Sequence, residues 1–137
     1  MPIELYWDDD ARTTMLCEVQ GRWTWDEMWD VLHKIKKVTD AADHEIAAIV
    51  HVIDGLNIPG GTIFTREAFD HARRILRMGE GGTGPIIVVG VSPLIRTIYN
   101  TFLPMDRKTI GAIRFADSVD DARALLTQRR QTRTSYA

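Results

Sequence analysis

Two segments of almost uninterrupted apolar character organise the chain. Residues 46–53 and 86–91 are rich in β-branched side chains, and the first of them ends at Asp54, which a glycine follows. A strand with one face in water alternates apolar and polar residues, whereas a strand buried on both faces is apolar throughout. The pattern therefore predicts two central parallel strands between layers of helices.

The first twenty residues alternate with a period of two. Apolar and polar side chains take turns over residues 3–8 and again over residues 13–20, and a short acidic link separates the two runs. Such a pattern indicates an antiparallel hairpin, which we expect at an edge of the sheet. Residues 112–116 form a further short run and predict the last strand.

Capping residues mark the starts of four helices. Thr24 with Glu27 makes a capping-box pattern, Thr65 and Ser118 hold the same N-cap position in two later segments, and Ser92 precedes a proline suited to the first helical turn. Apolar residues recur behind each cap at three- and four-residue spacing, which predicts helices. We expect the last helix to give way near residue 128 to a polar, basic tail that frays.

These elements predict an α/β fold with a mixed sheet and the order β-β-α-β-α-β-α-β-α. The chain has 137 residues, which suits one domain, and we expect that domain over residues 1–127 with the tail over 128–137. Parallel strands joined by right-handed crossovers place the connecting helices on the faces of the sheet.

Composition and charge exclude several function classes. The formal net charge of −2 creates no field that would draw the protein to nucleic acid or to an anionic membrane. No apolar run approaches the roughly 18–20 residues of a membrane span. Cys17 is the only cysteine, so no internal disulfide can form. Together with the lack of a signal-peptide pattern, this favours a cytoplasmic protein.

No set of residues points to catalysis or to a bound metal. His33, His44 and His71 lack metal-ligand spacing, and no Ser-His-Asp or paired-carboxylate arrangement can be assembled from the sequence. We therefore expect no enzymatic activity and no cofactor.

The predicted ligand or partner crevice lies at the carboxyl ends of the parallel strands. Open α/β sheets bind ligands at the carboxyl ends of their strands, which directs attention to Asp54, Asn57, Thr62, Thr65 and Ser92. Each of these residues also has a purely structural interpretation, because the same residue types end strands and cap helices.

A response-regulator receiver is an alternative interpretation of the acidic residues. The run 8–10, Asp54 and Ser92 imitate the acid pocket, the phosphoacceptor and the hydroxyl of such a domain. Two features oppose it, because the second segment reads as a strand where a receiver has a helix, and no lysine follows the last strand.

The order of elements resembles the STAS domains of the anti-sigma-factor antagonists, often called SpoIIAA-like. The features that carry the resemblance are the opening hairpin, the Gly-Arg-Trp-Thr-Trp-Asp-Glu run at 21–27, the apolar strand ending at Asp54, and the strand that passes into a last helix at 115–123. The resemblance implies a non-enzymatic regulatory or protein-interaction module. In the antagonists a serine at the start of the second helix is phosphorylated. Here only Thr62 or Thr65 lies at the matching place.

The segment after Ser92 predicts an interface. Tyr99, Phe102 and Leu103 widen the apolar face of this helix beyond the stripe of roughly 100° that one sheet face covers. Trp23 is a further interface candidate at the rim of the hairpin. We expect a homodimer through this helix, with any other protein partner unknown. A small-molecule or lipid-binding protein that uses the crevice beside Asp54 is the alternative function.

Overall fold

The computed structural model describes residues 2–55, 57, 59–60, 65–78, 84–91, 97 and 113–135. In these ranges the elements are β1 (Ile3–Trp7), β2 (Thr14–Val19), α1 (Trp25–Ala41), β3 (Ala47–Val52), α2 (Arg66–Met78), β4 (Ile86–Val89), β5 (Ile113–Ala116) and α5 (Val119–Ser135). The helix expected after Ser92, with its interface residues Tyr99, Phe102 and Leu103, lies outside the described residues.

One five-stranded sheet holds the strands in the order β1-β2-β3-β4-β5. β1 pairs antiparallel with β2, and every other neighbouring pair is parallel. The predicted mixed α/β sheet with an antiparallel opening hairpin is therefore confirmed. The receiver interpretation is wrong, because it requires the acidic run and Asp54 to lie together. Asp8 lies beside Thr14 at the start of β2, whereas Asp54 follows the far end of β3, so the two acidic groups lie at opposite ends of the parallel strands.

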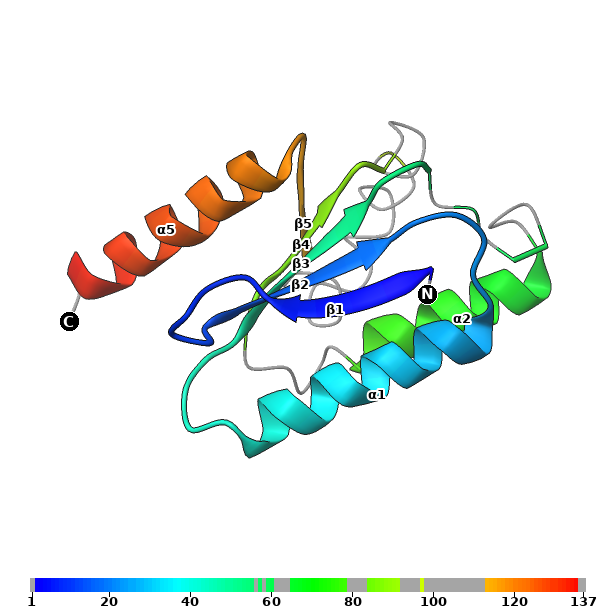
Figure 1. Cartoon of the computed structure of the whole chain (residues 1–137), viewed down its shortest axis with the longest axis horizontal. Coiled ribbons are helices and arrows are strands. Elements are labelled where there is room, and N and C mark those ends of the chain that lie inside the picture. The colour runs from blue at the N-terminus through cyan, green and yellow to red at the C-terminus, as the bar shows by residue number, and fades with distance from the viewer. Residues whose placement is uncertain are drawn as a thin grey trace.

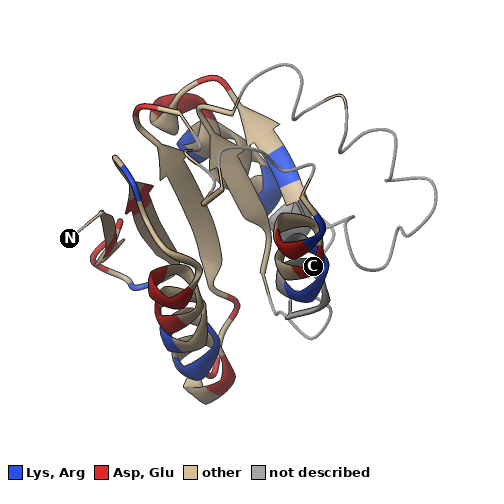
Figure 2. Ribbon diagram, turned by 90° about the vertical axis from the view of Figure 1, so that its right-hand side faces the viewer, with Lys and Arg blue, Asp and Glu red and all other residues tan. Residues whose placement is uncertain are grey.

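Helices cover both faces of the sheet, with α5 on one side and α1 and α2 on the other (Figure 1). β3 supplies both cores, since Ile49 packs in the cluster that contains Leu126 of α5, and Val50 packs against the cluster that contains Val31 of α1. Neither β3 nor β4 carries a lysine, arginine, aspartate or glutamate (Figure 2). Burial on both faces explains the apolar run that the sequence shows in these strands.

Local hydrogen bonds start the three described helices where the sequence predicts. The Glu27 amide donates to Thr24 Oγ1 at 3.2 Å, and the Thr24 amide donates back to the Glu27 carboxylate at 3.1 Å, which completes a capping box. Thr65 Oγ1 accepts from the Ala68 amide, and Ser118 Oγ accepts from the Asp121 amide. Among the described residues, no helix combines the length and the apolar character that a membrane crossing requires.

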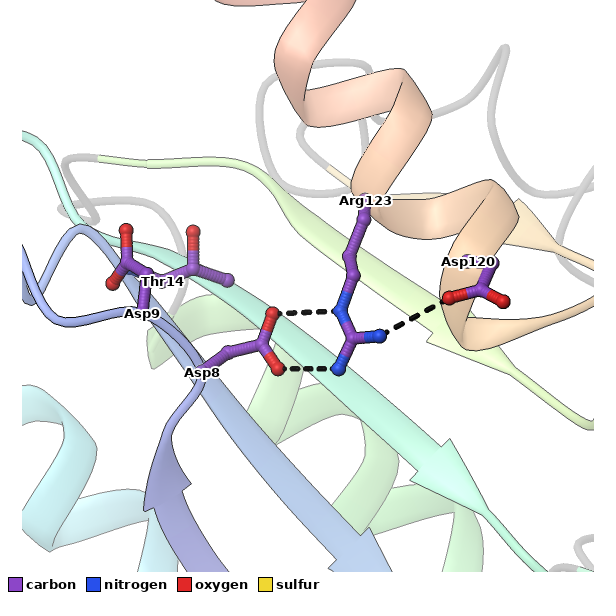
Figure 3. Close-up of polar contacts among 5 residues, drawn as sticks. All are labelled: Asp8, Asp9, Thr14, Asp120 and Arg123. Atoms are coloured by element: carbon purple, nitrogen blue, oxygen red, sulfur yellow. Dashed lines mark hydrogen bonds and ion pairs between the residues drawn. The ribbon is translucent and has the colours of Figure 1, made fainter.

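An arginine fork ties the start of α5 to the opening hairpin. Arg123 donates from Nε and Nη2 to the two carboxylate oxygens of Asp8, at 3.0 and 2.7 Å, and from Nη1 to Asp120 at 3.1 Å (Figure 3). The Asp8 side chain is only 10% exposed, so these bonds compensate a largely desolvated charge. The pKa of Arg123 is raised by its hydrogen bonds to Asp8 and by the charge of that carboxylate.

The last turns of α5 are also held, which corrects the expectation of a frayed tail from residue 128. Arg130 donates to Oγ1 of the buried Thr14 at 2.8 Å, and Arg129 pairs with Glu45. The helix itself runs from Val119 through Ser135. Thr14 is the first residue of β2 and Glu45 precedes β3. Both are far from α5 in sequence, so no local pattern could have indicated these contacts.

The turn between α1 and β3 contains a charge-dependent contact. His44 Nδ1 lies 2.9 Å from the Asp43 carboxylate, and His44 Nε2 lies 2.9 Å from the Arg12 carbonyl oxygen. Both neighbours are acceptors, so only the imidazolium donates to both at once. The hydrogen bond to the Arg12 carbonyl, followed by the bond to Asp43, raises the pKa of His44.

A pH-dependent stability follows from this contact. A pKa raised in the folded state stabilises the fold below the unfolded value of about 6.5, and the contribution disappears as pH rises through the folded value. We expect His44→Gln to lower the melting temperature at about pH 5 and to leave it nearly unchanged at about pH 8. Differential scanning fluorimetry of both proteins across this range measures the effect. An equal loss at both pH values would contradict the protonated bridge.

Candidate functional site

At the carboxyl ends of the parallel strands, Asp54 locks two loops together. The Gly21 amide donates to both carboxylate oxygens of Asp54, at 2.9 and 3.2 Å. The Asn57 side-chain amide donates to the Gly21 carbonyl at 3.1 Å and lies 3.4 Å from Asp54 Oδ1. The structure thus brings Asp54 and Asn57 together, and their contacts join the loop after β2 to the loop after β3.

The backbone at this lock is specialised. Gly21 has φ +69° and Asn57 has φ +45°, both in the left-handed region that glycine and asparagine tolerate best. The Thr65 hydroxyl is engaged as the cap of α2, and Thr62 and Ser92 lie outside the described residues. For Asp54, Asn57 and Thr65 the observed contacts are those of loop closure and helix capping.

Cys17 is not positioned as a nucleophile. Its side chain is buried in the core beside Val19 and Trp23. Burial, with a smaller contribution from the negative charge of Glu18, raises the pKa of the Cys17 thiol to about 11. The thiol is therefore protonated at neutral pH, and the thiolate is the reactive form. Among the described residues, no group of three histidine, cysteine, aspartate or glutamate side chains could hold a metal ion.

A tryptophan–histidine cluster joins α1 to α2. The His71 ring stacks on Trp25 with centroids 4.3 Å apart, and its Nδ1 accepts from Trp29 Nε1 at 3.0 Å. Acceptance at Nδ1 requires the neutral ring with its proton on Nε2, where Glu67 lies 3.9 Å away. The cluster orients the two helices, and sequence reasoning missed it because Trp29 and His71 are 42 residues apart.

The tryptophans divide between core and surface differently from the expectation. Trp23, an interface candidate from the sequence, is only 5% exposed and packs edge-to-face on Trp25 at 4.9 Å. Because Trp23 is buried in the core under α1, it is not available on the surface of the monomer for an interface. The exposed tryptophan is Trp7, 38% exposed at the end of β1, with the Arg12 guanidinium 5.9 Å from its ring centroid.

β1 presents a free backbone edge. It is the last strand on its side of the sheet, and no described element lies on its outer side (Figure 1). The Asp8 amide donates to the Thr14 carbonyl and the Gln20 amide donates to the Pro2 carbonyl, both at 2.8 Å. Hydrogen-bonded pairs alternate along an antiparallel ladder, so the even-numbered residues of β1 face β2. The N–H and C=O groups of Ile3, Leu5 and Trp7 consequently point outward.

Exposed aromatic side chains flank this edge. Tyr6 is 44% exposed on the face of the sheet that α5 covers elsewhere, and Trp7 is exposed on the face of α1. The Tyr6 hydroxyl contacts the Glu4 carboxylate on the same strand. On the opposite side of the sheet, Ile113, Phe115 and Ala116 of β5 have further interaction partners, so the two edges are not equivalent.

Comparisons with known proteins identify no relative of this chain. No protein-family model, no curated protein and no solved structure matches it. Within the described part of the chain, the β1 edge combines outward-facing backbone groups with the exposed rings of Tyr6 and Trp7.

Proposed function

We propose that this protein is a protein-interaction module that binds an extended polypeptide segment along β1. The observation that carries the proposal is the outward direction of the backbone groups of Ile3, Leu5 and Trp7, at an edge where Tyr6 and Trp7 are also exposed. Strand addition supplies affinity through main-chain hydrogen bonds and specificity through alternate side chains.

The energetics support this use of the edge. Each hydrogen bond made by a formerly hydrated backbone group contributes about 0.5–1.5 kcal/mol, and β1 offers both groups of three residues. Aromatic side chains concentrate binding energy at interfaces, because they bury a large area at a small cost in side-chain entropy. A partner strand would cover one ring on each face of the sheet.

A regulatory role of the STAS type, with phosphorylation at Thr62 or Thr65, remains a prediction from the resemblance. A phosphate on Thr65 would lie at the start of α2, where the helix dipole favours negative charge. Mass spectrometry of the protein from its native cells tests this prediction, and modification found only elsewhere would count against it.

A proline substitution isolates the backbone contribution of the edge. Leu5→Pro removes an outward N–H without breaking the ladder to β2, and proline is tolerated in this orientation on edge strands. Leu5→Ala is the matched control, since it also shortens the side chain but keeps the N–H. Phage-displayed random peptides of about six residues, the length of an ordinary strand, are selected on the unmodified protein.

We expect selected peptides to bind Leu5→Ala and to lose about tenfold in affinity for Leu5→Pro, the equivalent of one hydrogen bond. Their NMR shift changes should centre on the amides of Ile3, Leu5 and Trp7. Peptides that bind Leu5→Pro equally well, or that map to another surface, would overturn the proposed function.

A further inference from the structure

We infer that the strand added at this edge is β1 of a second copy of the chain, paired antiparallel about a two-fold axis at Leu5. The inference rests on the proposed function, because it names the occupant of the same edge. It differs from the dimer expected from the sequence, which uses the helix after Ser92.

The hydrogen-bond pattern of β1 is self-complementary in this register. With Leu5 opposite Leu5, Ile3 lies opposite Trp7 of the second copy and the reciprocal pair forms as well. These are the residues whose N–H and C=O groups point outward, and facing residues of an antiparallel ladder exchange both bonds at alternate pairs. Every outward backbone group of β1 is then satisfied on both copies.

The two neighbouring symmetric registers are less favourable. Centring the axis on Glu4 places the two Glu4 carboxylates opposite each other, and centring it on Tyr6 places Glu4 opposite Asp8 of the second copy. Like charges directly opposite on a sheet destabilise the pairing. Both shifts also move Ile3 or Trp7 beyond the facing residues of β1, so fewer outward groups pair.

The side chains fit the Leu5 register. Glu4 then lies opposite Tyr6 of the second copy. The Tyr6 hydroxyl and the Glu4 carboxylate are in contact within one chain, and the same pair of groups faces each other between the two copies. On the other face, the exposed ring of Trp7 lies opposite Ile3 of the second copy, an apolar residue that is only 6% exposed and places no charge beside the ring. Opposite side chains in such a ladder approach to about 4.5–5.5 Å between Cβ atoms, close enough for both contacts.

β1 also carries few of the features that keep edge strands apart. Its sequence, Ile-Glu-Leu-Tyr-Trp, contains no proline or lysine, and Glu4 is its only charged residue. Natural proteins protect open edges with such residues or cover them. A closed two-fold pair covers both edges at once and joins the two sheets, whereas an unpaired β1 would remain open to indiscriminate association.

A charge exchange tests both the occupant and the register. In the Leu5 register Tyr6→Glu places two carboxylates opposite each other on each side of the axis, whereas the double variant Glu4→Lys/Tyr6→Glu places opposite charges there. Both positions are exposed, and circular dichroism verifies that each variant is folded. The dissociation constant of the dimer is measured by sedimentation equilibrium.

We expect Tyr6→Glu to weaken the dimer at least about tenfold, and the double variant to recover to within about threefold of the unmodified protein. Hydrogen exchange should become slower at Ile3, Leu5 and Trp7 as concentration rises, while the amides of Glu4 and Tyr6 stay protected throughout. A double variant that dimerises no more tightly than Tyr6→Glu alone would overturn the register.

The outcomes separate the inference from the proposed function. Suppose that the protein remains monomeric at high micromolar concentration, yet binds peptides whose affinity Leu5→Pro lowers about tenfold. This result would overturn the second copy as the occupant and keep β1 as the interaction edge. A dimer unaffected by Leu5→Pro and Tyr6→Glu uses another surface, and it also overturns the inference. A monomer without edge-dependent peptide binding overturns both.

Discussion

Replacing Gly90 by alanine is expected to lower the free energy of unfolding by about 3 kcal/mol or more. Gly90 follows β4 and has φ +94°, a conformation that residues with a Cβ atom rarely adopt. An added Cβ would lie 2.2 Å from the carbonyl oxygen of Val52 and 3.2 Å from its carbonyl carbon. Both are backbone atoms at the end of β3, so relief requires the two central strands to move apart.

Gly60→Ala is the matched control for this prediction. Gly60 has nearly the same backbone angle, φ +88°, but an added Cβ there has no atom of the described residues within 4 Å. Its substitution should cost only the left-handed conformation, about 1–2 kcal/mol. Urea denaturation of the two variants measures the difference. Equal losses would show that backbone conformation alone decides the effect, and that β3 and β4 do not approach as closely as described.

Ile49→Ala should produce the second large effect, a loss of about 2–5 kcal/mol in the free energy of unfolding. The side chain is 0% exposed and belongs to the cluster between the sheet and α5, beside Ile87, Ala122 and Leu126. Removing three buried carbons forfeits their transfer free energy and leaves a cavity between strand and helix, which close packing around β3 prevents from collapsing fully.

Ile53→Ala provides the control, since it deletes the same atoms just beyond the same strand. Ile53 is 41% exposed, and we expect its loss to cost less than about 1 kcal/mol. The comparison by urea denaturation tests whether the α5 layer is an integral part of the core. Similar small losses at both positions would mean that α5 is loosely attached.

The sequence alone was sufficient for the features that depend on neighbours in the chain. The caps at Thr24, Thr65 and Ser118 are confirmed because each hydrogen bond spans only three residues. The double-sided burial of β3 follows from composition, because an apolar segment of strand length is stable only between two layers. The hairpin follows from the period of two in its strands.

Contacts between segments that are far apart in the chain could not be predicted from the sequence. Arg129 and Arg130 in the second half of α5 contact Glu45 and Thr14, which lie 84 and 116 residues away in the chain. Trp29 meets His71 across two helices, and Trp23 enters the core instead of the rim. In each case the residue type allowed either position, and packing against a remote element decided between them.

The candidate site shows the same division. The sequence by itself determined that Asp54 would end a central strand and that residues 3–8 would form a strand with apolar and polar faces. Only the tertiary structure decided that Asp54 closes loops through Gly21, that β1 ends the sheet, and which of its backbone groups point outward. Strand order and register are set by the simultaneous packing of all layers, and that information is spread over the whole chain.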